Sequence, residues 1–249
     1  MRAGFSDCDN RRIMMTFNEI HFETIGSTNT YARENAGELE APVLITADEQ
    51  TRGRGRRGNS FYSPKDEGIY FTLLFEAEPG FDLVTPAAAV CVCESIKELT
   101  GKETQIKWVN DIFYEGKKIC GILCERFAAG ERILTAAGIG INLTTRDFPA
   151  EIPQAGSLGV SAVGISLARD ISRRILETNS RFDRGRILGE YRKRLFILGQ
   201  EISFVKNGET FEGIAEDINT YCNLTVRTAG GYETLKSGEI SVKIRECNK

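Results

Sequence analysis

The sequence has few of the residues from which most protein metal sites are built. It contains one histidine, His21, and seven cysteines scattered without the close spacing of a disulfide framework. Since zinc and similar metals are held by several histidine or cysteine side chains, we expect no metal site made from these residues. An odd number of dispersed cysteines favours a reducing compartment, in which most of them are small buried hydrophobic residues.

Long apolar runs are missing as well. No stretch of the 249 residues approaches the roughly 20 apolar residues that cross a bilayer, and residues 1–16 lack the apolar centre of a secretion signal. The net charge of −3 does not favour binding to nucleic acid through overall charge. These features predict a cytoplasmic protein without a membrane partner.

The distribution of apolar residues predicts two structured parts after a leader. We interpret residues 1–17 as a leader without structure of its own. Over 18–198, strand-like and helical segments follow one another, which predicts a mixed α/β domain. Over 199–249, short alternating runs are separated by turn signals such as Lys206-Asn207-Gly208-Glu209, which predicts a small all-β domain.

The expected elements follow from periodicity and from capping signals. Ser27-Thr28-Asn29 supplies capping oxygens for a helix over 31–36 that Gly37 closes, and Thr85-Pro86 predicts the N-cap and first residue of a helix ending at Gly101. Further helices are expected at about 161–178 and 182–196. Strands are expected at 20–22, 43–46, 69–75, 105–108, 119–125 and 133–141, and in the smaller domain at 201–205, 210–216, 224–228, 232–235 and 239–244.

One loop concentrates positive charge. Between Gln50 and Ser63, which we call the arginine loop, glycines alternate with Arg52, Arg54, Arg56 and Arg57. Glycines let backbone N–H groups turn toward an anion, and guanidinium groups bind phosphate or carboxylate oxygens in bidentate geometry. The alternatives are a solvated flexible loop and an RNA-contacting basic segment. Because the loop lies between two expected strands and no basic aromatic surface extends it, a phosphate or carboxylate site is favoured.

Two further segments end apolar strands in polar residues. Lys107, Asn110 and Asp111 follow Ile106, where a lysine can neutralise phosphate and the other two can hold ribose, metal or an incoming amine. The alternative for Asn110-Asp111 is a plain turn, and for Lys117-Lys118 a solvated strand entry, which we favour for Lys117. Gly138-Ile139-Gly140-Ile141-Asn142 indicates either a bend or a ligand close to the backbone.

Together these motifs resemble the biotin–protein ligase family from Ser27 to about Lys243. The resemblance implies a mixed-sheet catalytic domain of the biotin/lipoate ligase type, followed by a small SH3-like β-barrel whose closing strand contains 237–241. It implies that ATP converts biotin to biotinyl-5′-AMP, with magnesium bound mainly through the ATP phosphates, and that a carrier lysine then displaces AMP. The motif residues are Ser27-Thr28-Asn29, Gln50, Gly53 to Gly58, Lys107 to Asp111, Lys118, Gly121 to Leu123, and Gly138 to Asn142.

The resemblance also implies roles for individual residues. Cations at Arg56, Lys107 and Lys118 would bring a carboxylate and a triphosphate together and offset the charge that develops during catalysis, and Asp111 would orient or deprotonate the carrier lysine. The expected biotin-binding residues are Ser27, Thr28, Asn29, Gln50, Arg54, Gly55, Arg56, Lys118 and Gly121. The expected ATP-binding residues are Arg56, Arg57, Phe61, Lys107, Asn110 and Asn142.

The sequence departs from the family pattern at two positions. Val109 stands where many relatives have proline, and Phe61 stands where a tryptophan often packs over the nucleotide. Fewer than 20 residues precede the expected catalytic domain, so we expect no DNA-binding domain and no DNA partner. The expected partners are biotin, ATP and the biotin carboxyl carrier domain of a carboxylase, and both a monomer and a homodimer stay open. The alternatives are a lipoate– or octanoate–protein ligase or transferase, and an RNA-binding module.

Overall fold

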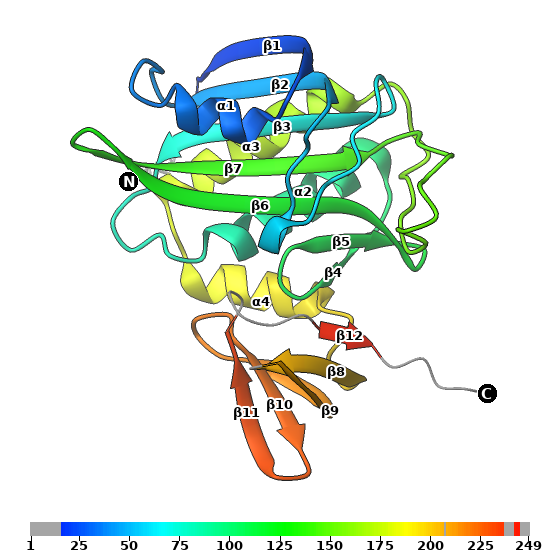
Figure 1. The fold of residues 1–249 in the computed structure, drawn as a ribbon. Helices are drawn as coiled ribbons and strands as arrows, with labels where there is room; N and C mark the ends of the chain where they lie inside the picture. Colours follow the sequence, from blue (N-terminus) through cyan, green and yellow to red (C-terminus); the bar gives the residue numbers. More distant parts are fainter. Residues whose placement is uncertain (1–15, 207, 237–241, 245–249) are drawn as a thin grey trace, which may run out of the picture.

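The computed structural model describes residues 16–206, 208–236 and 242–244, which form two sheets and four α-helices (Figure 1). The larger sheet has seven strands in the order β1-β2-β3-β7-β6-β5-β4. Only β1 and β2 pair in parallel; all other neighbours are antiparallel. The strands are β1 (Asn18–Ile25), β2 (Val43–Gln50), β3 (Gly68–Glu76), β4 (Gln105–Lys107), β5 (Asp111–Tyr114), β6 (Lys117–Ala129) and β7 (Arg132–Asn142).

Helices cover both faces of the central strands. Helix α1 (Thr28–Glu34) lies on one face, and α2 (Val84–Thr100) and α3 (Gly164–Ser180) lie on the other (Figure 1). This arrangement explains why β3 and β7 are almost continuously apolar and buried instead of alternating, since each has a hydrophobic layer on both sides. No helix in the described part of the chain is long and apolar enough to cross a membrane.

The smaller sheet follows α4 (Arg184–Arg194) and is antiparallel throughout, in the order β11-β10-β9-β8-β12. The expected all-β segment after Gly199 is therefore confirmed. The expected tight hairpin joins β8 to β9, although Asn207 in its turn lies outside the described residues. Residues 1–15 of the expected leader over 1–17 and the motif over 237–241 also lie outside them. The strands are β8 (Glu201–Lys206), β9 (Glu209–Ile218), β10 (Leu224–Thr228), β11 (Gly231–Leu235) and β12 (Val242–Ile244).

Two helix starts differ from the expectation. Helix α1 begins at Thr28 instead of residue 31, because Ser27 itself is the N-cap and its hydroxyl accepts from the backbone N–H of Thr30. Helix α2 begins at Val84 after Leu83, so the assignment of Thr85 as N-cap was wrong. Pro86 fits in the first turn, where backbone N–H groups lack intrahelical partners in any case.

Of the two predicted C-terminal ends of these helices, one was wrong and one was right. Helix α1 stops at Glu34 with Asn35 as its C-cap, so Gly37 does not close it. Helix α2 ends at Gly101, as expected, and that glycine adopts the left-handed conformation with φ of 72°. Both remaining helices lie within a few residues of their expected positions.

Candidate active site

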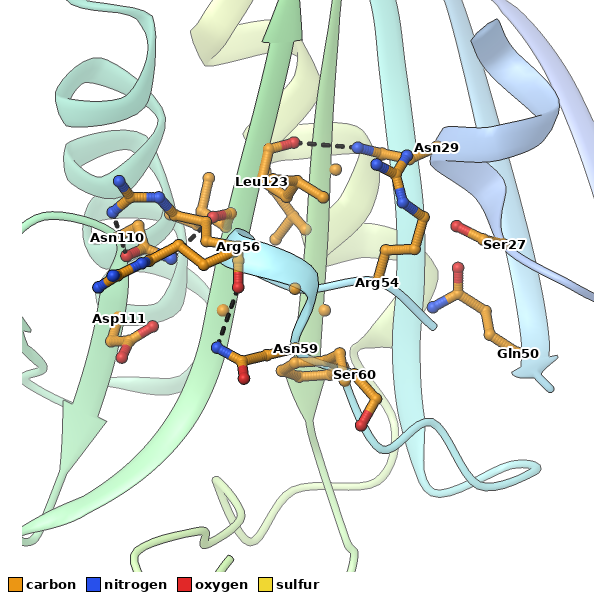
Figure 2. A pocket seen from close by; sticks show the side chains of 18 of the residues that line it. Ser27, Asn29, Gln50, Arg54, Arg56, Asn59, Ser60, Asn110, Asp111 and Leu123 are labelled. Atoms are coloured by element: carbon orange, nitrogen blue, oxygen red, sulfur yellow. Dashed lines mark hydrogen bonds between the residues drawn. The ribbon is translucent and has the colours of Figure 1, made fainter. Parts of the chain in front are cut away.

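A cavity of about 200 Å³ opens on the α1 side of the large sheet, over β6 and β7 (Figure 2). Its walls come from the N-terminus of α1, from the arginine loop and from the turn between β4 and β5. Every residue expected in the site lines it except Asn142. The expected residues that line it are Ser27, Thr28, Asn29, Gln50, Arg54, Gly55, Arg56, Arg57, Phe61, Lys107, Asn110, Asp111, Lys118 and Gly121.

Uncharged polar side chains joined by hydrogen bonds form the α1 end of the cavity, where Arg54 is the charged neighbour. Ser27, Thr28 and Asn29 are all buried, although they are polar. The backbone N–H and the hydroxyl of Thr28 donate to Gln50 Oε1 at 2.9 and 3.1 Å, while Gln50 Nε2 donates to Ser63 Oγ at 3.1 Å. These contacts orient the Gln50 amide, with its oxygen toward Thr28 and its nitrogen toward Ser63. This end of the cavity is therefore a preformed polar surface.

Sequence reasoning missed Thr72 on β3, which belongs to this network. Its hydroxyl donates to Asn29 Oδ1 at 2.6 Å and lies 2.8 Å from Thr28 Oγ1, and the side chain is fully buried. The sequence does contain a sign of this role, because Thr72 places a hydroxyl within the apolar run over 69–75. A buried polar group requires a hydrogen-bond partner, so such a residue points to a polar neighbour.

The arginine loop folds back on itself above the cavity. The N–H of Gly55 donates to Asn59 O at 2.7 Å, and the N–H of Phe61 donates to Gly53 O at 2.9 Å. Two arginines of the loop point in different directions in Figure 2: Arg54 lies beside Asn29, and Arg56 reaches Asn110. Burial lowers the pKa of the Arg56 guanidinium, although Asp111 acts in the opposite sense, and the group stays charged at neutral pH.

The segment after β4 is a turn, and Asp111 is the first residue of β5 rather than the end of a strand. Asn110 Oδ1 accepts from Arg56 at 3.1 Å, and its Nδ2 donates to Ile122 O at 2.9 Å. Asp111 Oδ1 lies 2.7 Å from Lys118 Nζ. Lys118 therefore belongs to the cavity, whereas exposed Lys117 points elsewhere and donates to Pro153 O.

The strand glycines make room for side chains that form the floor of the cavity. A Cβ atom at Gly138 would lie 2.0 Å from Asn29 Oδ1, and one at Gly140 would lie 2.4 Å from the ring of Phe61. Gly121 lies beneath the same ring, with its Cβ position 3.1 Å away. The side chains of Asn29 and Phe61 occupy the space over these glycines, while a ligand close to the backbone stays a prediction.

Asn142 lies in a neighbouring cavity of about 810 Å³, which shares Gln50, Phe61 and Lys118 with the first. Its Nδ2 donates to Gly156 O at 2.9 Å, and its buried Oδ1 has no hydrogen-bond partner among the described residues. The two cavities meet at Phe61 and Lys118, so a ligand that extends past these side chains would reach Asn142.

The sequence is similar to known proteins over nearly its whole length. Residues 21–143 match the biotin/lipoate A/B protein ligase family, and residues 197–243 match the biotin protein ligase C terminal domain. The bifunctional ligase/repressor BirA of Salmonella typhimurium is 26% identical over 89% of this chain and 73% of its own length. The biotin--[acetyl-CoA-carboxylase] ligase of Mycobacterium tuberculosis is 27% identical over 86% of this chain and 85% of its own.

Solved structures agree on the fold. The biotin protein ligase from Aquifex aeolicus in complex with biotin and ATP superposes with a TM-score of 0.78 at 24% identity, covering 92% of this chain and 99% of that one. The match over residues 21–143 places the chain in the biotin/lipoate A/B protein ligase class, and the fold agrees with this class. Since the second match is specific to the C-terminal domain of one branch of that class, the chain belongs to the biotin protein ligase family.

Proposed function

We propose that this protein is a biotin–protein ligase, which activates biotin with ATP and then transfers it to a lysine of a carrier protein. In the first step a biotin carboxylate oxygen attacks the α-phosphorus of ATP, giving biotinyl-5′-AMP and pyrophosphate. In the second step the carrier amine attacks the acyl carbon, AMP leaves, and the amine loses a proton. Residues 18–198 would perform both steps, and residues 199–249 would support them.

The observation that carries the proposal is that the two ends of one cavity differ in charge. One end offers neutral hydrogen-bonding groups from Ser27, Thr28 and Gln50, while the other presents Arg56 and Lys118 with Lys107 beside them. A neutral polar head would bind at the first end, and its carboxylate would extend toward the cations. A carboxylate and a triphosphate repel each other, so the positive charge at the cationic end would offset this repulsion and let the two groups come into contact.

The nucleotide would extend from this cationic end into the neighbouring cavity, past Phe61 toward Asn142. No group of three or more histidine, cysteine, aspartate or glutamate side chains suited to a metal lies among the described residues. The one carboxylate at the cationic end, Asp111, is paired with Lys118. Magnesium would therefore be held mainly by the ATP phosphates, where it would offset their charge.

The experiment that tests the proposal is biotin-dependent exchange of labelled pyrophosphate into ATP. We expect exchange in the wild type and a loss on the order of a hundredfold or more in Lys118→Ala and Arg56→Ala, since each removes a cation from the adenylation site. Lys117→Ala is the matched control, because its exposed neighbouring amine points away from the cavity, and it should exchange normally.

A panel of acids then distinguishes the members of the class. Exchange with lipoate or octanoate but not with biotin would identify the alternative ligases and contradict the choice of biotin. If none of the three acids supported pyrophosphate exchange, the proposed chemistry would be contradicted.

The proposal includes a compartment and a set of partners. The five cysteines in the described part of the chain, Cys91, Cys93, Cys120, Cys124 and Cys222, are all free thiols, which supports a reducing cytoplasm. The proposed partners are biotin, ATP and a biotin carboxyl carrier domain, and DNA is not among them. Sedimentation with and without ligands distinguishes a monomer from a homodimer, and sequence-specific DNA binding at physiological salt would contradict the predicted partner set.

A further inference from the structure

Glu125 lies on β6 outside both cavities described above, yet its carboxylate holds two residues that line the first cavity. Arg54 donates to both carboxylate oxygens, from Nη1 to Oε2 at 2.8 Å and from Nη2 to Oε1 at 2.9 Å. Asn29 Nδ2 donates to Oε2 at 3.1 Å. Three donors therefore converge on one carboxylate, which links the arginine loop to the N-terminus of α1.

These contacts continue into the floor of the cavity. The second hydrogen on Asn29 Nδ2 is directed to Leu123 O at 3.1 Å, and Asn29 Oδ1 accepts from Thr72. The network then reaches Thr28 and Gln50, where the arginine loop begins. A bond at Glu125 thus ties an arginine of the loop to the same network that anchors the start of the loop.

We propose that Glu125 is a positioning residue that holds the arginine loop closed over the cavity and keeps Asn29 oriented in its floor. The role concerns the biotin site and therefore rests on the proposed function. Four clustered arginines by themselves predict a loop that gains order only when an anion arrives. Glu125 offsets one of these charges with an ion pair of bidentate geometry, and its side chain is only 20% exposed.

The hydrogen-bond pattern requires a carboxylate at this position. In glutamine, one of the two oxygens becomes an NH₂ group. If that group replaces Oε1 it meets Arg54 Nη2, and if it replaces Oε2 it meets Arg54 Nη1 and Asn29 Nδ2. Either orientation brings donor against donor, so Glu125→Gln loses one of the two Arg54 contacts and the negative charge while keeping the size of the side chain.

The first test measures hydrogen exchange of the loop amides over 53–60 in the ligand-free protein. We expect exchange roughly tenfold faster in Glu125→Gln, the factor that corresponds to losing one charge-assisted contact. Glu19→Gln is the matched control, because Glu19 makes a similar bidentate pair with Arg169 at 2.8 and 2.7 Å on β1, away from the cavity. Unchanged loop exchange in Glu125→Gln, or an equal effect in Glu19→Gln, would overturn the proposal.

The second test separates positioning from a general effect on folding. In biotin-dependent pyrophosphate exchange we expect the KM for biotin to rise roughly tenfold in Glu125→Gln with a smaller change in kcat, and enzyme-bound adenylate to dissociate faster by a similar factor. Because Glu125 acts on the loop through Arg54, adding Glu125→Gln to Arg54→Ala should have a smaller effect than Glu125→Gln has in the wild type, and what remains reflects the contact with Asn29.

Additive effects of the two substitutions, or a normal KM and adenylate lifetime in Glu125→Gln, would contradict the role of Glu125. A wild type without biotin-dependent exchange would instead contradict the proposed function. The hydrogen-exchange result reports on the loop contact in either case, so the two failures are distinguishable.

Discussion

The contact between Asp111 and Lys118 places an acid and a base side by side at the cationic end of the cavity. The two groups are 2.7 Å apart, and about a quarter of each side chain is exposed. In the proposed reaction Asp111 would serve both steps: it would hold Lys118 while the adenylate forms, and it would accept a hydrogen bond from the carrier amine afterwards. A lysine with a reference pKa near 10.4 is neutral in only about one molecule in two thousand at pH 7, so help in losing its proton matters.

These two roles predict that Asp111→Asn slows transfer to the carrier more than it slows formation of the adenylate. We expect biotin-dependent pyrophosphate exchange to fall only a few-fold, whereas transfer of preformed biotinyl-5′-AMP to the carrier falls on the order of a hundredfold, as for loss of a general base. Single-turnover transfer measured by mass spectrometry of the carrier separates the steps. Transfer at the wild-type rate would show that Asp111 is not the base. Glu131→Gln, an exposed change in the β6–β7 turn, is the control.

Most elements could be predicted from the sequence because their signals are local. Apolar runs predicted the central strands, and Gly101 was correctly predicted as the C-cap of α2. Ser27 caps α1 within the predicted triplet 27–29, whereas the caps predicted at Thr85 and Gly37 were wrong. The turn between β4 and β5 was ambiguous, since Asn110-Asp111 reads equally as a strand end or as a turn. Glu125 and Thr72 were missed because their partners, Arg54 and Asn29, lie 71 and 43 residues away along the chain.

Lys107 ends β4, Asn110 lies in the turn and Asp111 begins β5. Two buried contacts hold the turn between these strands. Tyr191 of α4 donates through its hydroxyl to Val109 O at 3.0 Å, and Trp108 Nε1 donates to Cys222 O at 2.9 Å. Burial raises the pKa of the Tyr191 hydroxyl well above its ordinary value, so it stays a donor at neutral pH. The position of the turn therefore depends on an element far along the chain.

Removing the Tyr191 hydroxyl should loosen this turn. We expect Tyr191→Phe to lower the free energy of unfolding by about 1–3 kcal/mol, because a buried carbonyl loses its donor. The kcat of pyrophosphate exchange should fall more than the KM for biotin changes, since the cations move while the neutral end stays in place. Denaturant titration and steady-state kinetics measure both effects. Tyr221→Phe, at an exposed tyrosine, should alter neither, and wild-type behaviour of Tyr191→Phe would refute the argument.

The two sheets contribute to one shared hydrophobic cluster, which sequence patterns could not predict because it depends on long-range contacts. Ile202 and Leu224 of the small sheet belong to the same buried cluster as Trp108 and Leu195. Polar contacts reinforce the junction: Arg192 donates to Asp217 at 2.6 Å and to Ile218 O at 2.9 Å. The small sheet thus packs against the structure around the turn between β4 and β5.

This shared cluster predicts that the two sheets unfold together. Trp108 is the only tryptophan of the chain, and it is buried at this junction, so its fluorescence reports on the junction while far-ultraviolet circular dichroism reports on both sheets. We expect the two signals to change in one coincident transition in urea. Arg192→Ala should shift both midpoints downward together, because it weakens a contact that both sheets need. A fluorescence change at lower urea than the dichroism change would mean that the junction opens first. The small sheet would then be a separable unit, and its contact with the turn between β4 and β5 would be too weak to hold Lys107 and Asp111 in place.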